Sequence, residues 1–70
     1  MFRQSVQSSN LKIVGYDDQQ KILEIEFLNG RIYLYSGVPN EVYVALMEAP
    51  SHGKFFARFI KDQFPTTRIL

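Results

Sequence analysis

The sequence predicts an α+β domain in which a three-stranded antiparallel β-meander is followed by two helices packed on one sheet face, in the order βββαα. Three observations indicate this fold. Apolar and polar residues alternate over 21–28, which is typical of a half-buried strand. Asn29-Gly30 is a strong hairpin signal, and helical periodicity of apolar residues begins only after Pro39. A chain of 70 residues is enough for one small domain.

The three strands are expected at 11–17, 21–28 and 31–36. LKIVGYD carries β-branched and aromatic residues and precedes a DDQQ turn. KILEIEFL alternates apolar residues with Glu24 and Glu26, and RIYLYS follows the Asn-Gly turn. Residues 1–10 are polar and rich in serine and glutamine, so we expect an N-terminal arm or edge segment there.

Two helices are expected after the break at SGVPN. The first begins at Pro39 or Asn40 and runs to about Ala49, where Pro50 ends it. Ser51 is a suitable N-cap for a second helix over roughly 51–63, because Pro65 disfavours helix in the residue before it. This leaves 11–64 as a single domain and 65–70 as a C-terminal tail.

The composition argues against several classes of protein. The chain has no cysteine, which excludes disulfides and thiolate metal sites and fits a cytoplasmic protein. The N-terminus lacks the apolar stretch of a signal peptide, and no apolar run reaches the ~20 residues that span a bilayer, so no membrane association is expected. His52 has no second imidazole nearby, and no nucleophile–base or phosphate-loop spacing is present. We therefore expect no cofactor, no metal and no enzymatic activity.

Positive charge is concentrated in the C-terminal third, although the net charge is only +1. Residues 51–70 contain one acidic residue, Asp62, and four basic ones, Lys54, Arg58, Lys61 and Arg68. Lys54, Arg58 and Lys61 share one side of the second helix, although like charges at this spacing cost a few tenths of a kcal/mol. This stripe predicts contact with RNA or another polyanion, helped by Arg31 or Arg68. The alternative is a solvated helix face on which Asp62 pairs with Arg58.

The start of the second helix is a weaker candidate. Its free backbone N–H groups at Ser51-His52-Gly53 could bind an anion. Alternatively, Ser51 caps the helix and Gly53 allows it to pack closely on its neighbour.

A set of ordered residues resembles the KTSC domain, a small module named for the C-terminus of some lysyl-tRNA synthetases that also occurs as a free-standing bacterial protein. The resemblance extends from Ser8 to Phe64 and rests on YD at 16–17, Leu23, Ile25, Phe27, Gly30, Tyr33-x-Tyr35, Val38-Pro39, Val42-Tyr43, Leu46, Ala49, Ser51-x-Gly53, Phe55-Phe56 and Ile60. It implies RNA binding only through the synthetase context. Leu34, Ala57 and Phe59 depart from the family pattern, which commonly has polar residues there.

The direction of Tyr33 and Tyr35 depends on the turn at Asn29-Gly30. A two-residue turn places both tyrosines beside glutamates on the outer face, and local turn chemistry favours it. A three-residue turn with a left-handed Gly30 shifts the register by one and turns both tyrosines into the core. The family pattern favours this bulged register, and we predict it. Tyr33 and Tyr35 are then structural residues rather than a platform for stacked bases.

The bulged register also predicts an apolar patch on the outer sheet face, formed by Ile22, Leu28, Ile32 and Leu34. Two helices cannot cover both faces of the sheet, so the patch suggests a protein partner or a homo-oligomer. Coverage by the N-terminal arm or by Ile69-Leu70 is the alternative. The sequence thus leaves two functions open: a weak RNA-binding accessory module, or a protein-interaction or self-associating module without a nucleic-acid role.

Overall fold

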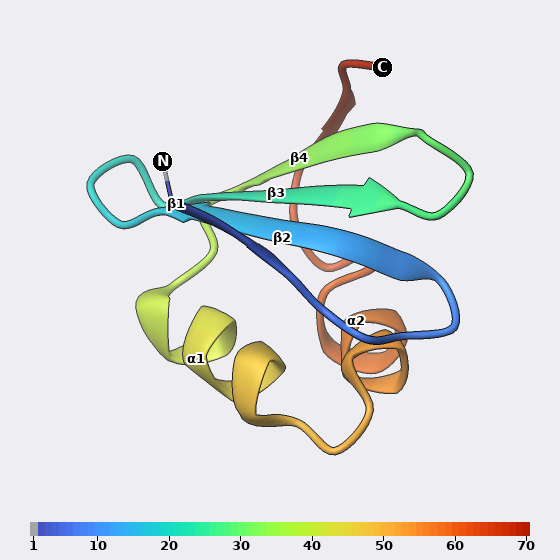
Figure 1. Cartoon of the computed structure of the whole chain (residues 1–70). Helices are drawn as coiled ribbons and strands as arrows, with labels where there is room; N and C mark the ends of the chain where they lie inside the picture. The colour runs from blue at the N-terminus through green and yellow to red at the C-terminus, as the bar shows by residue number, and fades with distance from the viewer. Residues whose placement is uncertain (1) are drawn as a thin grey trace.

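The computed structural model describes residues 2–70 as one antiparallel sheet with two helices on one side of it (Figure 1). The sheet order is β1-β2-β3-β4-β5, so consecutive strands are neighbours. The elements are β1 (Phe2–Ser5), β2 (Leu11–Asp17), β3 (Ile22–Phe27), β4 (Ile32–Ser36), α1 (Asn40–Glu48), α2 (His52–Phe59) and β5 (Thr66–Arg68).

The α+β class and the two helices on one sheet face are confirmed, but the prediction of three strands is corrected to five among residues 2–70. The additional strands are the two edges: β1 pairs with β2, and β5 pairs with β4. Their sequences, FRQS and TTR, are short and mostly polar, so no apolar alternation marks them as strands. Residues 2–5 of the expected arm and 66–68 of the expected tail therefore belong to the sheet.

The second helix ends earlier than predicted, at Phe59 instead of near residue 63. The Lys61 N–H donates to the Phe56 carbonyl oxygen at 2.9 Å, and Asp62 adopts a left-handed φ of 64°. A left-handed residue cannot continue a right-handed helix, so the chain turns here toward β5. The first helix lies where the sequence predicts it, over Asn40–Glu48.

The hairpin between β3 and β4 adopts the bulged register, which confirms that prediction. Ile25 lies opposite Tyr33, and Leu23 lies opposite Tyr35. Gly30 has a φ of 89°, the left-handed conformation that a three-residue turn with a bulge requires. Both tyrosines consequently project from the inner face of the sheet, on the same side as the helices.

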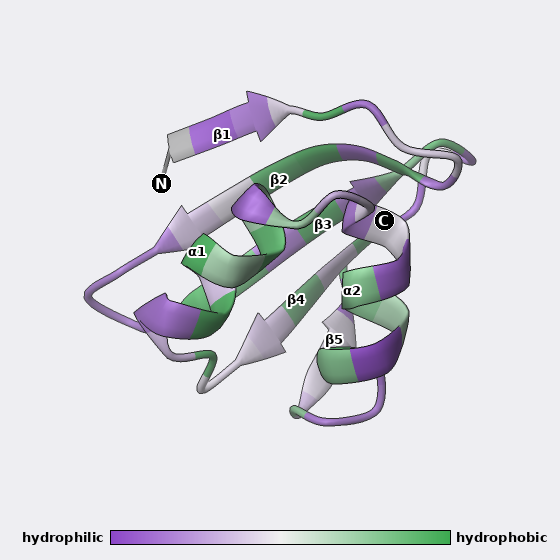
Figure 2. Ribbon diagram, turned by 90° about the horizontal axis from the view of Figure 1, so that it is seen from below, coloured by the Kyte–Doolittle hydropathy of each residue, from purple (hydrophilic) through white to green (hydrophobic). Residues whose placement is uncertain are grey.

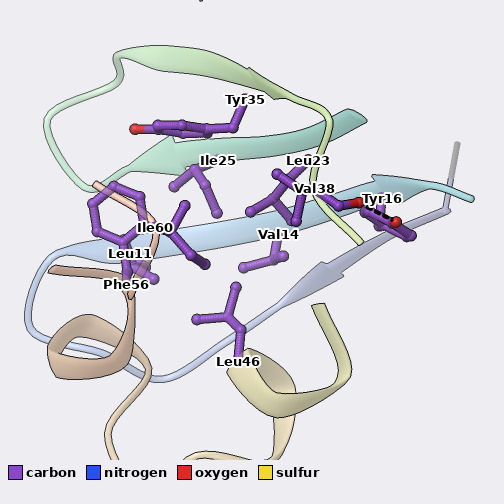
Figure 3. Close-up of a cluster of buried hydrophobic side chains, with 10 residues drawn as sticks. All are labelled: Leu11, Val14, Tyr16, Leu23, Ile25, Tyr35, Val38, Leu46, Phe56 and Ile60. Atoms are coloured by element: carbon purple, nitrogen blue, oxygen red, sulfur yellow. Dashed lines mark hydrogen bonds between the residues drawn. The ribbon is translucent and has the colours of Figure 1, made fainter. Parts of the chain in front are cut away.

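The core lies between the inner sheet face and the two helices (Figure 3). Its buried side chains are Leu11, Val14, Tyr16, Leu23, Ile25, Tyr35, Val38, Leu46, Phe56 and Ile60. Tyr16 and Tyr35 lie toward opposite ends of this cluster in Figure 3. Tyr35 is buried, as predicted for a structural residue, whereas Tyr33 is only half-buried at the margin of the core.

No helix of the described chain covers the outer sheet face (Figure 1). This face carries half-buried aliphatic side chains. Ile22, Ile32 and Leu34 lie there as predicted, because they alternate with the inward-facing residues of β3 and β4. Leu28 lies apart from them in the hairpin turn and is 57% exposed. Ile69 and Leu70 are 51% and 66% exposed, so the tail residues do not bury themselves against the patch.

Candidate nucleic-acid interface

The five basic residues predicted as polyanion contacts are all exposed and form no ion pair within residues 2–70; they are Arg31, Lys54, Arg58, Lys61 and Arg68. In the same part of the chain the other three cations are each paired with a carboxylate: Arg3 with Glu24, Lys12 with Glu26, and Lys21 with Asp18. The alternative pairing of Arg58 with Asp62 is not present among these ion pairs. Arg68 Nε donates to the Leu70 backbone oxygen at 3.2 Å. The other four, Arg31, Lys54, Arg58 and Lys61, are therefore the cations available to a ligand.

Lys54 and Arg58 lie on α2, and Lys61 lies in the turn that follows it. Hydrophilic and hydrophobic residues alternate along this helix (Figure 2). The Arg58 Cζ atom lies 5.5 Å from the centroid of the Phe59 ring, and Phe59 is 50% exposed. Exposed cations interleaved with aromatic rings are the features that single-stranded nucleic acids contact, through phosphates and bases respectively.

A groove of about 380 Å³ opens beside the β3–β4 hairpin, β5 and the turn after α2. Four aromatic residues form its floor: Phe27, Tyr33, Tyr35 and Phe56. Six polar residues complete its wall and rim: Asn10, Asn29, Arg31, Lys61, Asp62 and Thr66. Two of these four available cations, Arg31 and Lys61, thus lie at one aromatic groove. Its volume falls in the range of small-ligand sites, roughly 300–1,000 Å³.

The aromatic floor is rigid because its rings pack edge to face. The Phe27 ring centroid lies 5.7 Å from that of Tyr33, with an interplanar angle of 84°. Phe56 contacts both Phe27 and Tyr35 at 5.5 Å. These contacts fix the position of Tyr33 while part of its side chain stays open to the groove.

The hydroxyl groups of Tyr33 and Tyr35 remain available to solvent or a ligand. Tyr16 donates its hydroxyl hydrogen bond to the Val38 carbonyl oxygen. No other tyrosine hydroxyl within residues 2–70 donates a hydrogen bond to the protein. Burial, and then the neighbouring Tyr33 and Asp62, raises the pKa of Tyr35 to about 12. The Tyr35 hydroxyl is therefore protonated at neutral pH and can act as a donor.

Ser51 and Gly53 are accounted for by capping and packing. The Ser51 Oγ atom accepts a hydrogen bond from the Lys54 N–H at 3.2 Å, which makes Ser51 the N-cap of α2. A Cβ atom at Gly53 would lie 2.4 Å from the Asn10 Oδ1 atom and 3.2 Å from the Ser8 Oγ atom. Gly53 therefore lets α2 lie close to the segment between β1 and β2 without displacing the Asn10 side chain. Capping and close packing explain both residues without an anion site.

The groove itself was not predicted from the sequence. Asn10, Asn29 and Thr66 come from three separate segments, and no spacing in the chain relates them. The one relevant feature of the sequence is the family pattern, which predicts that Tyr33 and Tyr35 face inward. That pattern indicates core residues and does not indicate a groove.

His52 has a structural contact, since its Nδ1 atom lies 2.9 Å from the Leu46 carbonyl oxygen of α1. Residues 2–70 contain no cluster of three or more histidine, cysteine, aspartate or glutamate side chains that could hold a metal ion. In the same described part of the chain, neither helix has the length and apolarity needed to cross a membrane.

Comparison with known proteins identifies the family. The KTSC domain profile matches residues 7–64. The chain belongs to the KTSC domain family. A crystal structure of a KTSC domain protein from Yersinia pestis superposes on this KTSC domain with a TM-score of 0.93 at 40% identity, covering 99% of this chain and 97% of that one.

Sequence relatives of this KTSC domain occur both as small proteins and within longer ones. An uncharacterized protein of Stutzerimonas stutzeri is 49% identical over 63 residues, which cover 90% of this chain and 89% of the relative. A lysine–tRNA ligase of a Nostoc species is 41% identical over 58 residues, which cover 83% of this chain but only 10% of the ligase. The family resemblance inferred from the sequence is therefore confirmed.

Proposed function

We propose that this KTSC domain is a weak RNA-binding accessory module that acts by binding and not by catalysis. The observation that carries the proposal is that some cations of residues 2–70 are paired with carboxylates and others are not. Arg31, Lys54, Arg58 and Lys61 have no carboxylate partner, whereas Arg3, Lys12 and Lys21 are paired with carboxylates and Arg68 donates to the Leu70 backbone oxygen. Unpaired cations bind phosphates and release their counterions, which is the main source of affinity for nucleic acids.

The aromatic groove supports single-stranded RNA as the form that binds. Arg31 and Lys61 lie at its rim, and Arg68 is the cross-strand neighbour of Tyr33. Aromatic side chains beside cations suit unpaired bases, which stack on rings while the backbone follows the positive charge. Relatives named lysine–tRNA ligase contain a matching segment, which supports RNA as the polyanion.

Salt-dependent binding with a matched pair of double variants tests this proposal. Lys54→Gln with Lys61→Gln removes two unpaired lysines, and Lys12→Gln with Lys21→Gln removes two paired ones. Both variants have the same composition and net charge. Fluorescence anisotropy with labelled single-stranded RNA of ~12 nucleotides would be measured between about 50 and 200 mM salt.

The first variant is expected to lose affinity, and its slope of log K against log salt should decrease in magnitude by about 1.4, or 0.7 for each lost phosphate contact. The control should retain most of the wild-type affinity. Equal affinities for the two variants, or an unchanged salt slope in the first, would contradict the proposal.

The alternative function is self-association through the outer sheet face. It is favoured by the half-buried Ile22, Ile32 and Leu34, which no helix of the described chain covers. Sedimentation at high protein concentration tests it, because a monomer under these conditions would argue against a second copy on this face.

A further inference from the structure

The groove permits a more specific inference, which rests on the proposed RNA binding. We propose that it holds one unstacked base of the RNA strand and selects bases with two carbonyl oxygens, uracil above all, over adenine. The inference combines three features of the groove: an aromatic floor, two amide donors whose orientation is fixed, and one carboxylate acceptor.

Phe27 and Tyr33, the two half-buried rings of the floor, provide a surface for a base, whereas Tyr35 and Phe56 are only 4% exposed and support them from the core. Phe27, Tyr35 and Phe56 are locked together by edge-to-face contacts, with ring centroids 5.5 Å apart for each neighbouring pair. Tyr33 extends this cluster and is only half-buried. Stacking of a base on such a ring contributes about 1–3 kcal/mol without selecting among bases. Base selection must therefore come from the polar residues of the rim.

Two asparagines present hydrogen-bond donors at the groove. The Asn29 Oδ1 atom accepts the Arg31 N–H at 3.0 Å, and the Asn10 Oδ1 atom accepts the Ser8 hydroxyl at 3.0 Å. Because a backbone N–H can only donate, the Asn29 amide cannot be flipped without losing its bond. The Ser8 hydroxyl accepts from the backbone N–H groups of two residues, so its own proton is free to donate to Asn10. The Nδ2 groups of both asparagines are thus left as donors.

The carboxylate of Asp62 completes the set with an acceptor at the same groove. Two donors and one acceptor complement the Watson–Crick edge of uracil, which offers two carbonyl acceptors and one N–H donor. Adenine offers only one acceptor on this edge, its N1 atom, beside an amino donor, and would leave one of the two amide groups unpaired. Arg31 and Lys61 at the rim then suit the phosphates that flank the base.

Asn29→Asp is the decisive variant, because an aspartate Oδ1 atom can still accept the Arg31 N–H while the amide donor is lost. Binding would be measured by anisotropy for oligo(U), oligo(A) and an abasic strand of equal length. Gln63→Glu is the control, since it adds one negative charge beside Asp62 at an exposed position. Amide NMR spectra would verify that each variant is folded.

The wild-type protein is expected to prefer oligo(U) over oligo(A) about tenfold, as the loss of one hydrogen bond of ~1.4 kcal/mol with adenine would give. Asn29→Asp should reduce this preference to about threefold or less, and Gln63→Glu should weaken both strands equally. If Asn29→Asp does not fold, Asn10→Asp makes the same test, because it preserves the Ser8 contact in the same way.

Two outcomes would overturn the base pocket. Wild-type protein could bind oligo(U) and oligo(A) equally, or bind the abasic strand as tightly as oligo(U). Either of these results can occur while the Lys54 and Lys61 variant still loses RNA affinity, in which case the proposed function stands. The proposed function itself would be contradicted by a different result, namely an RNA affinity that does not change when Lys54 and Lys61 are replaced.

Discussion

Arg3 in β1 and Glu24 in β3 form a two-point ion pair across the strand that separates them. Arg3 Nε lies 2.6 Å from Glu24 Oε2, and Arg3 Nη2 lies 3.2 Å from Glu24 Oε1. Gly15 of β2 stands between the two residues in the sheet register, and without a side chain it leaves their path open. The hydrogen bond to Glu24 and its charge raise the pKa of Arg3. Glu24 is only 8% exposed, although it projects from the outer face.

Arg3→Ala is therefore expected to destabilise the protein, because it leaves a largely buried carboxylate without a partner. Adding Glu24→Gln should recover part of the loss, since a neutral amide tolerates burial better than a lone charge. Urea denaturation of both variants checks this order. Lys12→Ala removes the looser 3.7 Å pair with Glu26 and should change stability by about 0.5 kcal/mol or less. A double variant less stable than Arg3→Ala would contradict the expectation.

Tyr16→Phe is expected to lower the free energy of unfolding by about 1–2 kcal/mol. The Tyr16 hydroxyl donates to the carbonyl oxygen of the fully buried Val38 at 2.5 Å, so its removal leaves a buried acceptor without a donor. This bond ties β2 to the segment that leads into α1. Thermal or urea unfolding measures the change.

The matched control for that variant is Tyr43→Phe. Tyr43 stacks on Tyr16 with ring centroids 4.6 Å apart and an interplanar angle of 7°. Its substitution keeps the stacked ring and should cost about 0.5 kcal/mol or less. Equal costs for the two substitutions would show that the Val38 bond contributes little.

Gly53→Ala is expected to destabilise the protein by about 1 kcal/mol, even though alanine favours helix by about the same amount. The new Cβ atom would lie 2.4 Å from Asn10 Oδ1, so the Asn10 side chain must leave its contact with Ser8. In an Asn10→Ala background this obstacle is absent, and Gly53→Ala should become neutral or stabilising. A double-mutant cycle measures the coupling, and a cost for Gly53→Ala that is the same in both backgrounds would refute this explanation.

Alkaline pH is expected to destabilise the fold through Tyr35. Its pKa is raised from 10.0 to about 12, chiefly by burial, so the unfolded chain ionises this hydroxyl first as the pH increases. Stability that is fully present below about pH 10 is then lost as the pH rises toward 12. Tyr35→Phe should show a shallower loss in urea denaturation between about pH 8 and pH 11. A profile as steep as that of the wild type would assign the effect to other groups, such as Tyr16, whose pKa burial also raises.

The register of the hairpin and the two helices could be predicted because the relevant signals are local. Gly30 permits the left-handed turn, and the tyrosine pattern selects between only two registers. Ser51 and the prolines around the helices mark where each begins and ends. The inward direction of Tyr35 followed directly from that register.

The edge strands and the groove could not be predicted because they depend on contacts between distant segments. FRQS and TTR become strands by pairing with β2 and β4, and neither sequence has a β pattern of its own. The turn after α2 carries Lys61 and Asp62 to the groove, where a longer helix was expected. Tyr33 consequently lies at a half-open groove and not inside the core.

The edges of the sheet also bear on how the protein avoids aggregation. β1 has four residues and β5 has three, each contains an arginine, and together they cover the longer and more apolar β2 and β4. Short, charged outermost strands are poor templates for intermolecular strand addition. Deletion of either strand would expose the backbone N–H and C=O groups of β2 or β4. Truncated versions of this domain are therefore expected to aggregate before they lose their helices.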